Sequence, residues 1–362
     1  MNSDLNSKSI FDAAENTPMN ELKPIQEEQI NQPKIQPTKK ELRHDILTIC
    51  IALGAYIISV NVLVVIIAAI AVAVNSDVQK MILDIVKQGG GSLLSITGNT
   101  EYINAVSQVV AKVMGPAYII SAVVSVLWML TIRKKKLFTT DITTIGQKVK
   151  PFVIAKILVL IWGVQFVSSM ITMILNPALE NAGISLTDAM QQSIGMLFAT
   201  PMGIAAAVFV VPVIEEIIFR GAIMRKLERY GTNFAIIVSS LLFAVYHMIW
   251  LQAFFAFFVG LLLAYTAKRF SIKWSMLLHI LNNGIAAIIT ISAVSEIFEL
   301  STMIACAIGS AVILIIGRNK ISLIKEQGKP NIASPFKIAF SHPMFIITAV
   351  ILLGIGALTL GM

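Results

Sequence analysis

The chain has 362 residues, of which 56% are hydrophobic and only 13% are charged, and its mean hydropathy is +0.81. This composition excludes a soluble globular domain and predicts an all-α, polytopic bundle of transmembrane helices, because several apolar runs approach or exceed the roughly 18 residues that span a bilayer. The net charge of +8 comes largely from basic residues in short loops, so we expect a lipid bilayer around the protein and no nucleic-acid partner. Cys50 and Cys306 lie in apolar runs and indicate neither a disulfide framework nor a cysteine metal site.

The chain divides into four predicted parts. Residues 1–45 are polar and predict a disordered cytoplasmic tail, because they hold too little apolar surface to offset chain entropy. Residues 46–149 hold the first spans and an outer loop, residues 150–317 a core with polar motifs, and residues 318–362 a basic loop and a last span. We expect about eight to nine spans, because residues 253–267 form a short run that could be re-entrant. The expected spans are 46–74, 116–132, 152–175, 192–218, 233–250, 253–267, 274–294, 300–317 and 343–361.

Basic residues occupy alternate loops, which predicts an orientation. The loops at 133–150, 225–229, 268–273 and 318–320 are rich in Lys and Arg, whereas those near Glu180 and Glu299 carry none. The positive-inside rule then places the N-terminus in the cytoplasm and, with nine spans, the C-terminus outside. We expect a multi-pass protein of the cell (plasma) membrane.

Residues 75–115 carry apolar side chains at helical spacing, from Val78 through Met81 to Ile85, followed by Gly89-Gly90-Gly91. Such a pattern is typical of an amphipathic helix. Two interpretations stay open: a helix lying on the outer membrane surface, and an ordinary helix packed within the loop.

Ionisable residues inside the apolar runs require a functional explanation. Each costs roughly 2.5–3.5 kcal/mol at membrane depth, and such groups usually face a bundle interior or a water-filled cavity. The polar residues that we single out, from three separate runs, are Glu215, Glu216, Arg220, His247, His279 and Asn283.

Helical spacing predicts which of these side chains can meet. Glu216 and Arg220 are four residues apart, so they share a helix face and can pair. Glu215 lies about 100° around the helix from Glu216, so we expect the two carboxylates to point to different neighbours. Phe243 and His247 share a face in the same way, as do His279 and Asn283.

This set of groups suits hydrolysis of a peptide bond, which needs an activated water, a stabilised oxyanion and a proton for the leaving amine. A carboxylate removed from water is a usable base near neutral pH. Glu215 could deprotonate the water, with His247 as the second partner of that water. His279 and Asn283 could donate to the oxyanion, and the Glu216 and Arg220 pair could support the site.

A metal mechanism uses the same atoms. Glu215, His247 and His279 form a ligand set suited to catalytic zinc, so zinc stays an open alternative cofactor. The chain has no His-Glu-x-x-His run, which favours a site with no metal and no other cofactor. Spacing alone leaves both mechanisms open.

Three motifs in order resemble one family of membrane proteases. They are Glu215-Glu216-x-x-Phe219-Arg220-Gly221, Ser239-x-x-x-Phe243-x-x-x-His247 and His279-x-x-x-Asn283. This set, within residues 150–310, resembles the CPBP family of CAAX prenyl endopeptidases and bacteriocin-processing proteases, also called the type II CAAX protease or Abi family. The resemblance implies endopeptidase activity with catalytic roles for Glu215, His247, His279 and Asn283. Both metallo and glutamic mechanisms have been described for the family.

The expected function is therefore an intramembrane endopeptidase acting on a membrane-associated peptide or protein, either CAAX-like or bearing a leader as bacteriocin precursors do. Two other functions compete with it. Intact motifs also suit a non-proteolytic immunity or scaffold protein. Intramembrane Glu and His also build proton relays in transporters, although the chain lacks the internal repeat that many transporters show.

Overall fold

The computed structural model describes residues 37–88, 96–181, 183, 185, 188–292, 296–317 and 334–358. Over these ranges the chain is helical, and its only β-type pairing is an isolated antiparallel bridge between Ile145 and Ser271. The all-α prediction is therefore confirmed. Most of the predicted polar tail, the Gly89-Gly90-Gly91 run and the basic loop at 318–333 lie outside the described residues.

The helical elements follow in chain order. The N-terminal part comprises α1 (Lys39–Val74), α2 (Ser76–Lys87), α4 (Thr100–Ser125), η2 (Val126–Met129), α5 (Leu130–Arg133) and η3 (Leu137–Asp141). Next come α6 (Pro151–Glu180) and α7 (Asp188–Phe198). A continuous stretch then joins α8 (Pro201–Ala205), η4 (Ala206–Val210), α9 (Val211–Glu216), η5 (Ile217–Met224), α10 (Arg225–Leu227) and η6 (Glu228–Tyr230). The last elements are α11 (Thr232–Tyr246), α12 (Trp250–Arg269), α13 (Ile272–Ile291), α14 (Glu296–Gly317), α15 (Pro335–Phe340) and α16 (Pro343–Leu358).

Seven helices in the described part of the chain are long and apolar enough to cross a membrane, and two shorter apolar helices lie at Thr232–Tyr246 and Pro343–Ile355. Together they match the nine predicted spans in order. The segment that we allowed to be re-entrant forms α12, whose 20 residues are enough to cross. Several apolar helices of this length make the chain a multi-pass membrane protein.

Local capping explains where the observed helices depart from the predicted spans. The predicted span 192–218 is wrong in its start and its end, because α7 ends at Phe198 and a new helix begins at Pro201 and runs to Tyr230. Thr200 caps that helix by accepting from the Gly203 amide at 3.1 Å, and proline suits its first turn. Helix α1 likewise begins at Lys39 rather than at residue 46, because Thr38 caps it.

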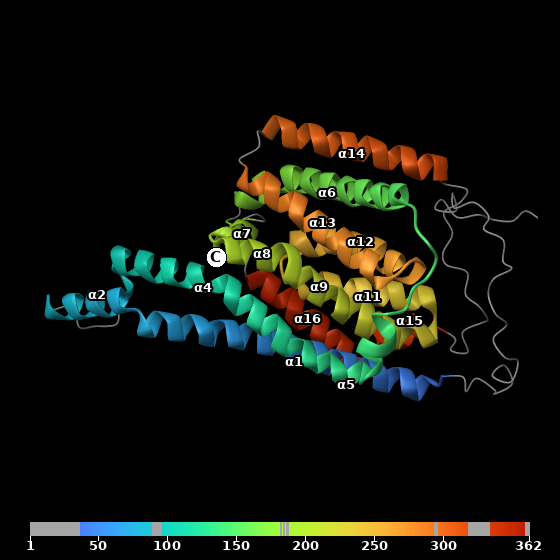
Figure 1. Cartoon of the computed structure of the whole chain (residues 1–362), viewed down its shortest axis with the longest axis horizontal. Coiled ribbons are helices and arrows are strands. Elements are labelled where there is room, and N and C mark those ends of the chain that lie inside the picture. Colours follow the sequence, from blue (N-terminus) through green and yellow to red (C-terminus); the bar gives the residue numbers. More distant parts are fainter. Residues whose placement is uncertain are drawn as a thin grey trace, which may run out of the picture.

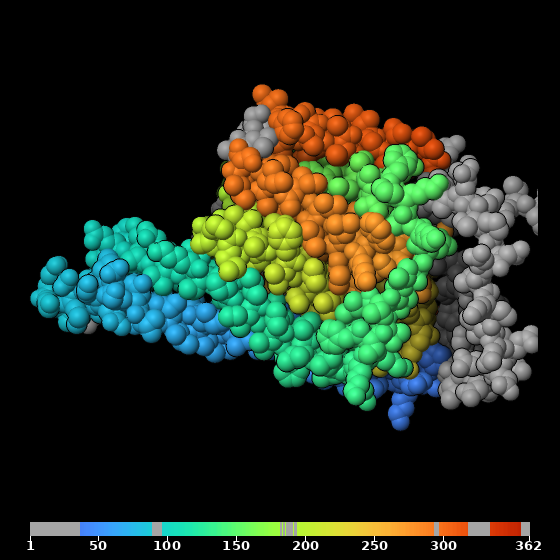
Figure 2. Space-filling model, viewed as in Figure 1, coloured from blue at the N-terminus to red at the C-terminus, as the bar shows by residue number. Residues whose placement is uncertain are grey.

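The helices form a bundle with an extended arm. In Figure 1, α14 lies on α6, α6 on α12, and α12 on α11, with the α1 and α4 pair along the opposite side. Helix α1 has 36 residues, which corresponds to about 54 Å, well beyond a hydrocarbon core of about 30 Å. Its last turns, the start of α4 and the short helix α2 project from the bundle as an arm (Figure 2). The amphipathic helix predicted within residues 75–115 is therefore present as α2.

Ion pairs fasten the start of α1 to the end of the long central stretch. Asp45 is buried, and its carboxylate lies 3.1 Å from Lys226 Nζ and 2.5 Å from Arg229 Nη2. Tyr230 donates its hydroxyl to the same carboxylate at 2.7 Å. The start of α1, helix α5 and the turn between α12 and α13 also lie at this end of the bundle (Figure 1). The lysines and arginines of these connections therefore gather at one end, whereas Lys80 and Lys87 lie on α2 in the arm.

Candidate active site

The polar site lies on a helix with unusual local geometry. Elements η4 and η5, which flank α9, are π-helical, and such turns are frequent at functional sites. Gly221, in η5, lets two neighbours approach: a Cβ added there would lie 3.2 Å from Leu137 Cδ1 and 3.5 Å from Ile272 Cδ1. The irregular helix thus presents Glu215, Glu216 and Arg220 to the bundle interior, where all three are buried.

Glu216 is the centre of a buried network. Its Oε1 lies 3.3 Å from Arg220 Nη1 and 3.1 Å from His279 Nδ1. Its Oε2 lies 2.5 Å from the hydroxyl of Ser275, which is also 2.9 Å from the Leu263 carbonyl. The predicted pairing of Glu216 with Arg220 is therefore present, and Glu216 also links that pair to α13.

Arg220 is completely buried and compensated on three sides. In addition to the contact of Nη1 with Glu216, Nη2 of Arg220 donates to the Gly260 carbonyl on α12 at 3.1 Å. Its guanidinium lies 4.4 Å from the centre of the Phe243 ring on α11. A charge held by a carboxylate, a carbonyl and an aromatic face ties the central helix to both neighbours.

Glu215 and His279 form the part of the site where a water could react. Glu215 Oε2 lies 3.7 Å from His279 Nε2, beyond a direct hydrogen bond but close enough that one water beside the pair can bond to both. The expectation that the two glutamates point to different neighbours is wrong. The nitrogens of an imidazole lie on different sides of its ring, so His279 meets Glu216 with Nδ1 and Glu215 with Nε2.

The number of protons that the cluster of Glu215, Glu216, Arg220 and His279 holds decides its net charge. Arg220 compensates one of the two carboxylates, so the four groups are neutral when Glu215 and His279 together hold one extra proton. A neutral cluster costs least in a low-dielectric interior. Because Nδ1 of His279 faces a carboxylate oxygen, which only accepts, this nitrogen carries a proton, and Nε2 faces Glu215.

His247 faces the same aromatic ring as His279. Its Nδ1 lies 2.8 Å from the Phe243 carbonyl, which can only accept, so Nδ1 donates and Nε2 of a neutral ring is left as an acceptor. The centre of the Phe243 ring lies 4.8 Å from that of His247 and 5.8 Å from that of His279. Both imidazoles therefore contact the Phe243 ring edge-on, and Phe243 lies beside His247 as their shared helix face predicts.

Asn283 and Ser239, the other polar motif residues, bond to nearby backbone. Asn283 donates to the Ala207 carbonyl at 3.1 Å, which joins α13 to η4 and uses one of its two amide hydrogens. Ser239 donates to the Ile236 carbonyl of its own helix at 3.2 Å. The structure thus places Asn283 against the helix that carries Glu215, with no described contact to the carboxylate itself.

The sequence patterns did not predict three groups of this site. Ser275 lies one turn before His279 on α13, and Gly260 supplies a carbonyl to Arg220. Tyr56 of α1 reaches toward the site, with its hydroxyl 3.4 Å from that of Tyr246. A serine one helical turn from a candidate histidine was the only pattern that pointed to any of them.

The residues proposed as zinc ligands do not form a ready-made metal site. Among the described residues, no three His, Cys, Asp or Glu side chains gather closely enough to hold a metal ion. Glu215 and His279 are close to each other, whereas His247 contacts the Phe243 ring and has its Nδ1 2.8 Å from the Phe243 carbonyl. The donor set therefore fits zinc poorly in this arrangement.

One known family matches part of the chain. Residues 197–285 match the family model described as type II CAAX prenyl endopeptidase Rce1-like. This segment is similar to that family. The match is consistent with the CPBP resemblance, and the Rce1-like segment contains all three motifs from Glu215 to Asn283. Rce1-like proteins are a protease family, so the match supports a hydrolase with a peptide substrate in a membrane setting. Compared with curated proteins and with solved structures, the chain has no significant match.

Proposed function

We propose that this protein is an intramembrane endopeptidase that hydrolyses a peptide bond through a water activated by Glu215. The observation that carries the proposal is the 3.7 Å gap between Glu215 Oε2 and His279 Nε2, buried in the bundle and backed by Glu216. An acid–base pair that can hold one water, in a buried site, is what hydrolysis in a membrane requires.

The proposed reaction starts with Glu215 ionised and His279 doubly protonated. Glu215 takes one proton from the water, while the other hydrogen of the water forms a hydrogen bond to Nε2 of His247. The resulting hydroxide adds to the peptide carbonyl carbon, and the oxyanion accepts from Nε2 of His279 and from the remaining amide hydrogen of Asn283. Glu215 then gives its proton to the leaving nitrogen as the carbon–nitrogen bond breaks. Glu215 and His279 return to their starting protonation states.

Glu216 and Arg220 support this chemistry in the proposal. Glu216 accepts from Nδ1 of His279, which fixes the orientation of that ring and stabilises its positive charge. Arg220 prevents Glu216 from adding an uncompensated charge beside Glu215. We favour the glutamic mechanism over a metal-dependent one, because the donor set forms no ready-made metal site.

Assays with and without a chelator test that preference. Activity of the purified protein should be unchanged after prolonged treatment with a strong chelator. Loss of activity that returns with zinc at one ion per chain would establish the metal mechanism instead.

The substrate class follows from the setting of the site. We propose a membrane-associated peptide, either a CAAX-like C-terminus or a leader-bearing precursor similar to those of bacteriocins. The protein would lie in the plasma membrane with its N-terminus in the cytoplasm, because the lysine-rich and arginine-rich connections gather at one end of the bundle.

A peptide assay tests both the reaction and the substrate class. The full chain in lipid nanodiscs would be offered a prenylated CAAX-like peptide and a leader-bearing peptide in ¹⁸O-labelled water, with the products analysed by mass spectrometry. We expect cleavage of one class, with one ¹⁸O atom in the new carboxyl group. Folded protein that cuts neither peptide would favour an immunity or scaffold role, or a proton-coupled transporter.

A further inference from the structure

The connection between α5 and α6 carries a feature that the proposed reaction does not use. A hollow of about 540 Å³ opens on its surface, with a largely apolar wall. Its lining consists of Leu130, Lys134, Lys135, Phe138 and Thr139. Apolar side chains and lysines around one hollow match a ligand with an apolar part and an anionic part.

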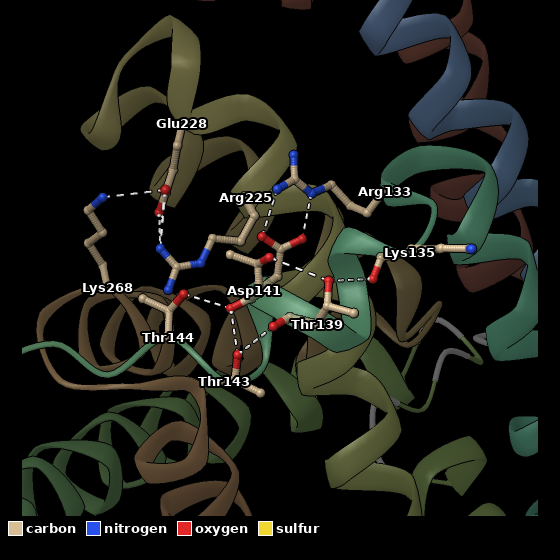
Figure 3. Close-up of polar contacts among 10 residues, drawn as sticks. Arg133, Lys135, Thr139, Asp141, Thr143, Thr144, Arg225, Glu228 and Lys268 are labelled. Carbon is tan, nitrogen blue, oxygen red and sulfur yellow. Dashed lines mark hydrogen bonds and ion pairs between the residues drawn. The ribbon is translucent and has the colours of Figure 1, made fainter. Parts of the chain in front are cut away.

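The lysines beside this hollow are not neutralised by the rest of the described protein. Asp141 forms two short hydrogen bonds with Arg133, at 2.7 and 2.6 Å, and is buried (Figure 3). Glu228 is likewise engaged by Arg225 at 3.1 Å and by Lys268 at 3.4 Å (Figure 3). The carboxylates of Asp141 and Glu228 are therefore already paired with cations other than these lysines.

The side chains of Lys134, Lys135 and Lys136 are exposed, and no described carboxylate pairs with them. In Figure 3 the Lys135 side chain points away from the ion pairs. This leaves a concentrated positive charge at the mouth of the hollow, complementary to a phosphate group.

The hollow is built on a well-ordered frame. Thr139 donates its hydroxyl to the Lys135 carbonyl at 3.0 Å, and Thr143 donates to the Thr139 carbonyl at 2.9 Å (Figure 3). Leu137 is fully buried beneath it, against Gly221 of the central helix. The lysines and Phe138 are therefore displayed on a folded turn.

The depth of the hollow suits a phospholipid. Leu127 and Trp128 are 58% and 43% exposed on the helix just before the hollow, and tryptophan is enriched at membrane–water interfaces. Lys134 follows Trp128 by six residues, roughly 9 Å farther along the helix axis. The apolar wall includes Leu130, between Trp128 and Lys134 in the chain, and Phe138, which is 48% exposed. Trp128 and the apolar wall thus precede the lysines, as the acyl chain of a phospholipid lies on the membrane side of its phosphate.

We propose that this hollow binds one anionic phospholipid, with its phosphate on Lys134 and Lys135 and the start of an acyl chain against Leu130 and Phe138. Basic pockets at the cytoplasmic ends of membrane helices suit such head groups. The site is separate from Glu215 and His279, so it does not depend on the proposed proteolysis.

Native mass spectrometry of the full chain tests this site. Purified protein would be titrated with phosphatidylglycerol and with phosphatidylcholine of the same acyl chains. We expect preferential retention of phosphatidylglycerol, weakened on the order of ten-fold in the double variant Lys134→Gln/Lys135→Gln. The matched control, Lys148→Gln/Lys150→Gln, removes the same charge from exposed positions of the same connection and should retain the lipid.

Further variants separate a folding defect from loss of the site. Lys134 has a φ of 50°, which is uncommon for residues other than glycine, so a substitution there can disturb the turn. The single variant Lys135→Gln avoids that position, and the melting temperature of each variant reports whether it is folded. Phe138→Ala should also weaken retention, whereas Ile145→Ala, at a residue 76% exposed outside the hollow, should not.

Four results would overturn the proposal. These are equal retention of both lipids, equal loss in the control double variant, displacement of the lipid by inorganic phosphate, and stronger binding of an acidic polypeptide than of phosphatidylglycerol.

Discussion

The orientation of Glu216 depends on the hydroxyl group of Ser275. It approaches Glu216 Oε2 at 2.5 Å and sits four residues before His279 on the same helix face. A hydrogen bond to a charged group contributes about 1.5–3 kcal/mol. Loss of this contact would free Glu216 to rotate away from His279.

We therefore expect Ser275→Ala to lower kcat on the order of ten-fold or more, with KM little changed, because the substrate does not touch Ser275 in the proposed reaction. Ser240→Ala is the matched control: that serine is also buried, but its hydroxyl bonds only to the Ile236 carbonyl of its own helix at 2.7 Å. Equal losses in both variants would show that Ser275 acts through packing alone.

Glu216 and Arg220 allow a test of charge compensation. Removing one member of a buried pair leaves an uncompensated charge and costs about 3–5 kcal/mol. We expect Glu216→Gln and Arg220→Gln each to lower the melting temperature of the detergent-solubilised protein. The double variant should be more stable than the sum of the two losses predicts. Strictly additive losses would contradict the pairing.

The spacing of motif residues predicted part of this site. Four-residue separations correctly paired Glu216 with Arg220 and placed Phe243 beside His247. The same reasoning failed for Glu215, because helix geometry gives the direction of a side chain and not the partner that arrives from another helix. Contacts such as that of Ser275 depend on how α13 packs against α9, which no local pattern encodes.

At the scale of elements, Gly260 sets the distance between α12 and α11. A Cβ added there would lie 3.2 Å from Phe243 Cδ1 and 3.3 Å from Ser240 Cα. The same residue supplies the carbonyl that accepts from Arg220. Any side chain at Gly260 would push apart the two helices that carry Phe243 and this carbonyl.

We expect Gly260→Ala to destabilise the protein by about 1–3 kcal/mol and to lower activity, because overpacking moves both helices. Gly54→Ala offers a matched control in α1, since an added Cβ there meets nothing within 4 Å. It should leave activity unchanged and add about 0.5–1 kcal/mol of helix stability in the folded protein. Thermal unfolding in detergent and an activity assay measure both effects, and an opposite ranking would refute the packing argument.

The boundaries of elements were predicted less well than their existence. Hydropathy placed a single span at 192–218, because the residues on both sides of Thr200 are apolar. The cap at Thr200 and Pro201 divides that run, and ion pairs near Asp45 allow the helix to continue past its apolar part to Tyr230. Caps and ion pairs decided these ends, and an average of hydropathy registers neither a cap nor the pairing of two charges.

At the scale of the whole molecule, the orientation in the membrane is the main expectation still to be measured. Helix α1 begins and α16 finishes at opposite ends of the bundle (Figure 1). With lysines and arginines concentrated at the end where α1 begins, we expect a cytoplasmic N-terminus and an outside C-terminus. An alkaline phosphatase fused after Met362 should be active and a green fluorescent protein fused there dark. The reverse pattern would invert the proposed topology.

The most direct test of the central claim compares new protein N-termini in membranes that carry the wild type, Glu215→Gln or the control Glu101→Gln, which removes a carboxylate from the exposed start of α4. All three proteins should be present at equal levels. We predict fragments that appear with the wild type and with Glu101→Gln but are absent with Glu215→Gln. The same fragments at full yield in the Glu215→Gln membranes would contradict Glu215 as the base that activates the water.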